Sequence, residues 1–193
     1  MKPYLLGIAG PSASGKSTVS RMLIERYPSA VRINLDDFFF DKDTFPIHNG
    51  WSNWELPQNL NFLKLHSVLS DLVKGSSVTV PDYSKKEGKA VGEKTVRPKD
   101  LIIVEGFYLF NDRKIRDLFN LKIFLDLPED IQMKRRLERQ PDLDPRYFIE
   151  VIAPFFRKYG LPAKKHADYV IDASRDIDKV AEDIMYLLKE RLS

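Results

Sequence analysis

The sequence contains no cysteine and only three histidines, which excludes several kinds of chemistry at once. Without cysteine the chain has no disulfide bonds, no thiolate nucleophile and no cysteine-based metal site. This composition fits a reducing compartment. His48, His66 and His166 lie far apart and without the spacing of metal ligands, so we expect no histidine-based metal site either.

Long hydrophobic runs and a strong imbalance of charge are also absent. The apolar stretch in the N-terminal segment MKPYLLGIAG is too short for a secretion signal or a membrane span. The net charge is only +3, which gives no reason to expect nucleic acid or a membrane as a partner. The expectation is a cytoplasmic protein that handles small anionic molecules, and the sequence makes no prediction of the oligomeric state.

What the chain does contain is enough apolar material for one sizeable core. Of its 193 residues, 43% are hydrophobic and 31% are charged, which is ordinary for a globular protein. No repeat, low-complexity segment or shift in composition divides the chain. We therefore expect a single domain over residues 1–193.

The stretch YLLGIAGPSASGKST, residues 4–18, carries the strongest functional signal. The pattern G-x-x-x-x-G-K-[ST] of a phosphate-binding P-loop is matched by Gly10, Gly15, Lys16 and Ser17. An apolar strand precedes the pattern and a helix follows it, as the motif requires. We expect backbone N–H groups to bind the phosphates of a nucleotide, Lys16 to reach the terminal phosphates and Ser17 to ligate Mg²⁺. The predicted phosphate-binding set is Gly10, Ser12, Ala13, Ser14, Gly15, Lys16, Ser17 and Thr18.

Short apolar strands alternate with amphipathic helices, which is typical of an α/β fold with a mostly parallel sheet covered on both faces. The expected strands cover residues 4–9, 30–35, 101–104, 121–127 and 169–171. The expected helices cover residues 16–27, 57–74, 112–119, 128–140, 145–159 and 177–188. Residues 41–56 lack periodicity and are predicted to form an ordered loop. Residues 78–97 are predicted to form a small hairpin outside the core.

Two acidic residues follow predicted strands: Asp36 ends the second strand, and Glu105 ends the third. Because ligands of open α/β sheets bind beyond the carboxyl ends of the strands, both carboxylates are expected near the P-loop. A phosphate cradle with two carboxylates is the set of groups that phosphoryl transfer needs. An acidic residue after a strand can also be a turn or helix cap, and this alternative stays open for both.

The segments GPSASGKST, LDDFF, NWELP, LIIVEGFYLF and MKRRLER occur in the order found in the uridine kinase and nicotinamide riboside kinase family of P-loop kinases. The chain resembles this family over nearly its whole length. The resemblance implies a P-loop NTPase fold with a five-stranded parallel core sheet and a mobile lid over about residues 128–142. It also implies an enzyme that uses ATP and Mg²⁺ to phosphorylate the 5′-hydroxyl of a riboside. On this resemblance Asp36 is the base that takes the proton of the acceptor hydroxyl, and Glu105 helps to hold the metal.

The same resemblance implies an acceptor site. Trp54 matches an aromatic residue that stacks on the base, and Glu55 matches an acidic residue that binds the ribose hydroxyls, although the family commonly has Asp there. Phe39 and Tyr83 complete the predicted acceptor site, the latter from the 78–97 hairpin. Taken on their own chemistry, Trp51 and Trp54 could simply pack in a lid or in the core.

The basic helix contains Lys134, Arg135, Arg136 and Arg139, which resemble the lid arginines of the family. Arg135 and Arg139 lie four residues apart on one helical face and are predicted to be catalytic, supplying positive charge as the bond to the γ-phosphate breaks. Arg136 is predicted, by the resemblance, to reach the ribose hydroxyls. The alternative is a solvated basic face, and nucleic-acid binding is not expected from so short a cluster.

The features that bear on the choice of riboside conflict. LDDFFF and EGFYLFN resemble nicotinamide riboside kinases, whereas VPDYSKKEGKAVGEKTVRP resembles the hairpin that uridine kinases place over the base. Uridine kinases carry a histidine shortly after the position of Tyr83 and an arginine-rich end of the lid. This chain has no histidine there, and Gln140, Pro141 and Asp142 stand in its lid.

Two further classes of function remain open. One is a P-loop kinase of a non-nucleoside alcohol such as pantothenate or glycerate. The other is a nucleotide-binding regulator without a small acceptor, although the guanine-binding pattern N-K-x-D of GTPases is absent from the chain.

Overall fold

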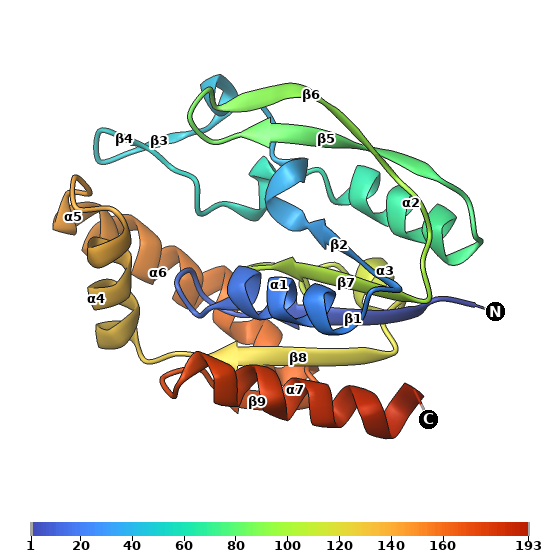
Figure 1. Ribbon diagram of the computed structural model, residues 1–193. Helices are drawn as coiled ribbons and strands as arrows, with labels where there is room; N and C mark the ends of the chain where they lie inside the picture. Colours follow the sequence, from blue (N-terminus) through green and yellow to red (C-terminus); the bar gives the residue numbers. More distant parts are fainter. Residues whose placement is uncertain (1, 193) are drawn as a thin grey trace.

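The centre of the structure, a computed structural model that describes residues 2–192, is a sheet of five strands (Figure 1). Their order is β2-β7-β1-β8-β9, and every pairing is parallel. The strands are β1 (Tyr4–Ala9), β2 (Ala30–Asn34), β7 (Leu101–Gly106), β8 (Leu121–Asp126) and β9 (Tyr169–Asp172). The predicted α/β fold with a five-stranded parallel core is confirmed. The end residues of the predicted domain, 1 and 193, lie outside the described residues.

Alternate residues of the strands point to opposite faces of the sheet and pack on different helices. Leu6 and Ile8 of β1 belong to a core cluster shared with α1 and α7, whereas Leu5 and Ala9 belong to a cluster shared with α2 and α3. These helices are α1 (Lys16–Arg26), α2 (Phe62–Val73), α3 (Arg113–Arg116) and α7 (Ile177–Leu192). The sheet is therefore covered on both faces, which explains why its strands read as nearly continuous apolar runs.

The chain between β8 and β9 is almost entirely helical. α4 (Glu129–Arg139) is the predicted basic helix, and it begins directly after Pro128. A second helical stretch follows, and it is made of short α-helical, π-helical and 3₁₀ segments. The sequence instead predicts a single regular helix over residues 145–159. The segments of this stretch are α5 (Pro145–Tyr147), η4 (Phe148–Ile152), α6 (Ala153–Phe155), η5 (Phe156–Gly160) and η6 (Leu161–His166).

Two small antiparallel hairpins lie outside the main sheet. β5 (Val78–Ser84) pairs with β6 (Lys89–Val96), as predicted, and this hairpin contacts η1 (Leu35–Phe38), the turn after β2. The second hairpin, β3 (Ile47–His48) with β4 (Trp51–Ser52), lies within the predicted loop 41–56. The remaining single turns are η2 (Lys42–Thr44) and η3 (Pro57–Asn59).

Some predicted boundaries differ from the structure by a few residues. Glu105 and Gly106 are the last residues of β7 and do not follow it, because they still pair with β1 and β2. The helix expected over residues 112–119 is only one turn long, and the Asp112 side chain caps it by accepting from the Ile115 N–H. No helix among residues 2–192 is both long enough and apolar enough to cross a membrane.

Candidate active site

The P-loop joins β1 to α1, and three of its residues have positive φ angles, which residues other than glycine rarely adopt. φ is 149° at Gly10, 64° at Ala13 and 88° at Gly15. A Cβ atom at Gly10 would lie 2.4 Å from the carbonyl oxygen of Leu125, so glycine is required there by space as well as by backbone angle. The loop ends where α1 begins, and the first N–H groups of a helix have no partners within it. The arrangement is that of an anion site at a helix N-terminus.

Lys16 is a buried cation in this loop. Its Nζ donates to the carbonyl oxygen of Pro11 at 2.7 Å, and only 9% of the residue is exposed. Burial lowers the pKa of the ammonium group to about 8, although Glu105 and Asp36 act in the opposite direction. No carboxylate among the described residues forms an ion pair with it. Because a buried charge without a direct counter-charge is costly, Lys16 is poised for an anionic ligand such as a phosphate group.

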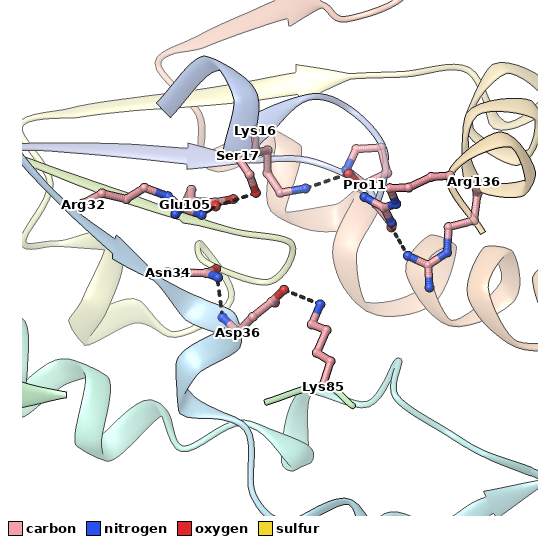
Figure 2. Close-up of polar contacts among 11 residues, drawn as sticks. Pro11, Lys16, Ser17, Arg32, Asn34, Asp36, Lys85, Glu105 and Arg136 are labelled. Atoms are coloured by element: carbon pink, nitrogen blue, oxygen red, sulfur yellow. Dashed lines mark hydrogen bonds and ion pairs between the residues drawn. The ribbon is translucent and has the colours of Figure 1, made fainter. Parts of the chain in front are cut away.

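Ser17 and Glu105 meet beside the P-loop (Figure 2). Ser17 Oγ donates to Glu105 Oε1 at 2.6 Å, and the guanidinium group of Arg32 on β2 pairs with the same oxygen. Glu105 is only 2% exposed, so its charge is held by these neighbours. A hydroxyl and a carboxylate at the phosphate end of the site are oxygen ligands that Mg²⁺ accepts while keeping several waters. These residues therefore fit the metal that the fold family implies.

Asp36 lies in η1, directly after β2, and faces the P-loop across the site (Figure 2). Its N–H donates to the side chain of Asn34, and its Oδ2 accepts from Lys85 Nζ at 2.5 Å. Burial acts to raise the pKa of Asp36, but Lys85, Lys16 and Arg32 outweigh it and hold that pKa below its ordinary value. The group is therefore an ionised carboxylate at neutral pH, the state required of a proton acceptor.

The predicted acceptor aromatics form a packed group at the far end of the site. The Trp54 ring packs edge-to-face on Phe39 and Phe45, with centroids 5.4 Å and 5.0 Å apart. Tyr83 packs on Phe39 from behind, and its hydroxyl donates to the carbonyl oxygen of Phe40 at 3.2 Å. Phe39 and Trp54 line the cavity, whereas Tyr83 does not. Tyr83, predicted as part of the acceptor site, therefore packs on a ring that lines the cavity and does not line it itself.

Glu55 is a buried carboxyl group in the wall of the same cavity, with 8% of the residue exposed. Burial raises its pKa to about 7, and the nearby positive charges of Arg136 and Lys85 oppose this effect without cancelling it. The carbonyl oxygen of Glu55 accepts from the hydroxyl of Tyr108 at 2.8 Å, which fixes the backbone at this point. The carboxyl group itself lines the cavity, where its two oxygens could accept from or donate to a pair of hydroxyl groups.

We expect Glu55→Gln to make the stability of the protein less dependent on pH. The raised pKa means that the folded protein binds this proton more tightly than the unfolded chain does. The resulting stabilisation is complete below the unfolded pKa and is lost as the pH rises to about 7, an effect of up to about 3 kcal/mol. Urea unfolding from about pH 5 to about pH 8 measures it. The free energy of unfolding should fall with pH less steeply in Glu55→Gln than in the wild type or in Glu87→Gln, an exposed control. Equal slopes in all three proteins would contradict the assignment.

The arginines of α4 point in two directions. Arg136 and Arg139 both donate to Ser12 Oγ in the P-loop, at 2.9 Å and 3.2 Å. Arg135 donates to the carbonyl oxygens of Ala173 and Ser174, after β9, and does not line the cavity. The prediction that Arg135 and Arg139 act together over the γ-phosphate is corrected, because in the structure Arg136 and Arg139 are the pair at the phosphate end.

One cavity of about 840 Å³ connects the two ends of the site. The predicted residues that line it are Ser12, Ala13, Gly15, Lys16, Ser17, Thr18, Asp36, Phe39, Trp54, Glu55, Glu105, Arg136 and Arg139. Of the predicted set, Gly10, Ser14, Tyr83 and Arg135 do not line it. Gly10 and Ser14 instead contribute to the conformation of the loop: Gly10 has a positive φ, and the Ser14 side chain is fully buried.

Reasoning from the sequence missed three residues that matter to the site. Lys85 reaches Asp36, Arg32 holds Glu105, and the Tyr147 hydroxyl donates to the Ser52 carbonyl oxygen at 3.3 Å while accepting from the Trp54 N–H at 3.4 Å. Arg32 could have been noticed in the sequence, because it is the one charged residue of a short apolar strand. Tyr147 carries no signal that separates it from a core aromatic residue.

Comparison with known proteins identifies the family. The sequence profile of the phosphoribulokinase / uridine kinase family matches residues 5–179. The chain belongs to this family. As a member of the phosphoribulokinase / uridine kinase family it is an enzyme, a phosphotransferase with an alcohol group as acceptor. The resemblance to the uridine kinase family noted from the sequence is thereby confirmed.

Several relatives within the family match nearly the whole chain. It is 31% identical to the uridine kinase of Leuconostoc citreum, with 98% of this chain and 99% of that protein covered. It is 32% identical to uridine kinase-like protein 3 of Arabidopsis thaliana over 95% of this chain, which spans only 42% of that longer protein. The phosphoribulokinase of Rhodobacter spheroides has the same fold, with a TM-score of 0.64, 16% identity and coverage of 90% of this chain and 73% of that one.

Proposed function

We propose that the protein transfers the γ-phosphate of ATP to the 5′-hydroxyl of a riboside. The observation that carries the proposal is one continuous cavity, which has the P-loop at one end and Asp36, Trp54 and Glu55 at the other. The uridine kinases among its relatives support a nucleoside as acceptor. We further propose that residues 1–193 act as one kinase unit, with a lid over about 128–142 and substrate-side segments 41–56 and 78–97.

The donor end binds ATP through the P-loop. Backbone N–H groups surround the phosphate oxygens, and Lys16 turns from the Pro11 carbonyl oxygen to the terminal phosphates. Ser17 and Glu105 would hold Mg²⁺, which would neutralise charge on the phosphate oxygens. Arg136 and Arg139 lie next to Ser12 and supply positive charge from the lid side as the phosphoryl group moves.

Asp36 acts on the acceptor. Its carboxylate accepts the proton of the 5′-hydroxyl while the hydroxyl oxygen forms its bond to the γ-phosphorus. The bond from that phosphorus to the bridging oxygen of ADP breaks, and ADP leaves. Strong proton abstraction is not required, because phosphoryl transfer depends mainly on positioning and on stabilisation of charge.

The acceptor end binds the riboside by two kinds of contact. Trp54 offers an aromatic surface to the base, and the Glu55 carboxyl group binds the ribose hydroxyls. A cationic nicotinamide ring would gain cation–π attraction at this surface, and a neutral pyrimidine would stack there as well. The missing histidine after Tyr83 and the lid residues Gln140, Pro141 and Asp142 weigh against a strict pyrimidine preference.

ADP release with Mg-ATP and a panel of acceptors tests the proposal. The panel contains uridine, cytidine, nicotinamide riboside and adenosine as ribosides, and pantothenate and glycerate as other alcohols. We expect turnover with at least one riboside, and loss of turnover when its 5′-deoxy analogue is used. Turnover with a non-nucleoside alcohol alone would replace the proposal by a different kinase. Binding of ATP with no acceptor in any screen would point to a regulator.

A further inference from the structure

Lys85 occupies a position that neither the proposed reaction nor the P-loop motif explains. It follows the last residue of β5 and extends from the hairpin turn toward η1. Its Nζ lies 2.5 Å from Asp36 Oδ2, and the side chain lines the cavity. In Figure 2 the two side chains point toward each other from opposite elements, with Lys16 and the P-loop beyond them. The contact joins residues 49 positions apart in the chain.

The hairpin is fixed against the segment that carries Asp36, so the backbone on both sides of the ion pair is held, while the Lys85 side chain itself is 60% exposed. The Lys42 N–H donates to the Gly88 carbonyl oxygen at 2.7 Å, and the Tyr83 hydroxyl donates to that of Phe40. Lys94 of β6 lies 3.8 Å from the carboxylate of Asp37. Three contacts on both strands and on the turn therefore hold the backbone from which Lys85 reaches Asp36.

The geometry of the pair leaves one oxygen of Asp36 for the acceptor. Lys85 donates to Oδ2, and within residues 2–192 no other side chain donates to this carboxylate. Without that bond the Asp36 side chain would be free to rotate about its own torsions. Since small misplacements of reacting groups cost large factors in rate, a single well-placed hydrogen bond to the base has a kinetic effect.

We propose that Lys85 is a positioning residue that holds the Asp36 carboxylate toward the acceptor hydroxyl. This inference rests on the proposed function, because it assigns Asp36 the proton of the acceptor. Lys85 acts through Oδ2, and the proton moves from the hydroxyl to Oδ1. On this proposal Lys85 acts on the base and not on the transferred phosphoryl group, so its contribution should exist only while Asp36 is a carboxylate.

The charge around Asp36 also predicts a pH effect. Four positive groups face it from different elements: Lys85 from the hairpin turn, Lys16 from α1, Arg32 from β2 and Arg139 from α4. Asp37 and Glu55 are the acidic neighbours. Removing Lys85 leaves the other three cations in place. The acidic limb of the pH–activity profile should therefore move to higher pH, but by less than it would if all four cations were removed.

Steady-state kinetics of four variants tests the proposal. The variants are Lys85→Met, Lys85→Arg, Lys86→Met as the neighbouring exposed control, and the double variant Asp36→Asn with Lys85→Met. We expect Lys85→Met to lower kcat about tenfold, with the KM for Mg-ATP within about twofold and the acidic limb of kcat/KM shifted to higher pH. Lys85→Arg should recover most of the activity, and Lys86→Met should match the wild type. The double variant should be no slower than Asp36→Asn alone.

Two results would overturn the proposal. A kcat for Lys85→Met equal to or above that of the wild type would mean that the lysine only occupies the place of the acceptor. An equal loss in the Asp36→Asn background would mean that Lys85 acts directly on the substrate.

The outcome is separable from that of the proposed function. The variants are assayed with whichever alcohol the panel identifies, so a non-nucleoside acceptor refutes the riboside proposal while Lys85 is still tested. If no alcohol reacts, the inference is tested by a pH titration that follows the ¹³C chemical shift of the Asp36 carboxyl carbon in the wild type and in Lys85→Met. This measurement needs no acceptor. An unchanged titration would reject the inference.

Discussion

Asp36→Asn is expected to lower kcat by a factor of about 10²–10⁴ while the affinity for Mg-ATP stays within a few-fold of the wild type. Asparagine keeps the shape of the side chain but cannot take a proton at neutral pH. The P-loop and its contacts are untouched, since Asp36 lies on η1 across the cavity from Lys16. Single-turnover measurements of riboside phosphorylation, together with calorimetric binding of Mg-ATP, separate the two effects.

Asp37→Asn is the matched control for this variant. Asp37 is the next residue of the same turn and does not line the cavity. Asparagine removes the charge that Lys94 faces at 3.8 Å but keeps an oxygen for the backbone hydrogen bond from Tyr83, and the contacts of Lys42 and of the Tyr83 hydroxyl still hold the hairpin. Loss of the Asp37 charge should leave kcat nearly unchanged. A near-normal kcat for Asp36→Asn would show that Asp36 is not the base, whereas equal losses in both variants would indicate a distorted turn.

Lys16→Met is expected to lower kcat/KM for ATP by about 10³-fold without lowering the free energy of unfolding. Lys16 supplies charge to the phosphates, and removal of one such preorganised donor costs about that factor. Its burial in the free protein, which lowers its pKa to about 8, shows that the ammonium group is poorly solvated there. An apolar side chain of similar length avoids this cost, so stability should be equal or higher.

Kinetics with varied Mg-ATP and urea unfolding of the same samples provide the two readouts. Lys64→Met on the exposed face of α2 controls for the loss of one positive charge. If Lys16→Met lost stability and activity together, the loss of activity would be a consequence of unfolding. If activity remained, Lys16 would have no role in binding the terminal phosphates.

The β5–β6 hairpin and helix α4 show why parts of the site could not be predicted from the sequence. The register of β5 and β6 shifts between Asp82 and Tyr83, and such an irregularity changes the direction of the side chains that follow. Tyr83 therefore packs behind Phe39, and Lys85 reaches the cavity. On α4, Arg135 and Arg139 share a helical face by spacing, but long side chains bend toward different partners. Arg135 finds the carbonyl oxygens after β9, which are far away in sequence.

The sequence by itself determined the donor end of the site. The P-loop is a contiguous motif whose glycines, lysine and serine act through the local backbone, and the alternation of apolar strands and helices required a parallel sheet. Because carboxyl ends of neighbouring parallel strands meet at one edge, Asp36 and Glu105 could be placed near Lys16 before the fold was known. Only the tertiary structure decided the acceptor end. There, Lys85 reaches Asp36 and Tyr147 contacts the Ser52–Trp54 segment, in each case across a large distance in sequence. The direction of these side chains depends on how the hairpin packs on the turn after β2 and on how the helical stretch after α4 packs on residues 51–54.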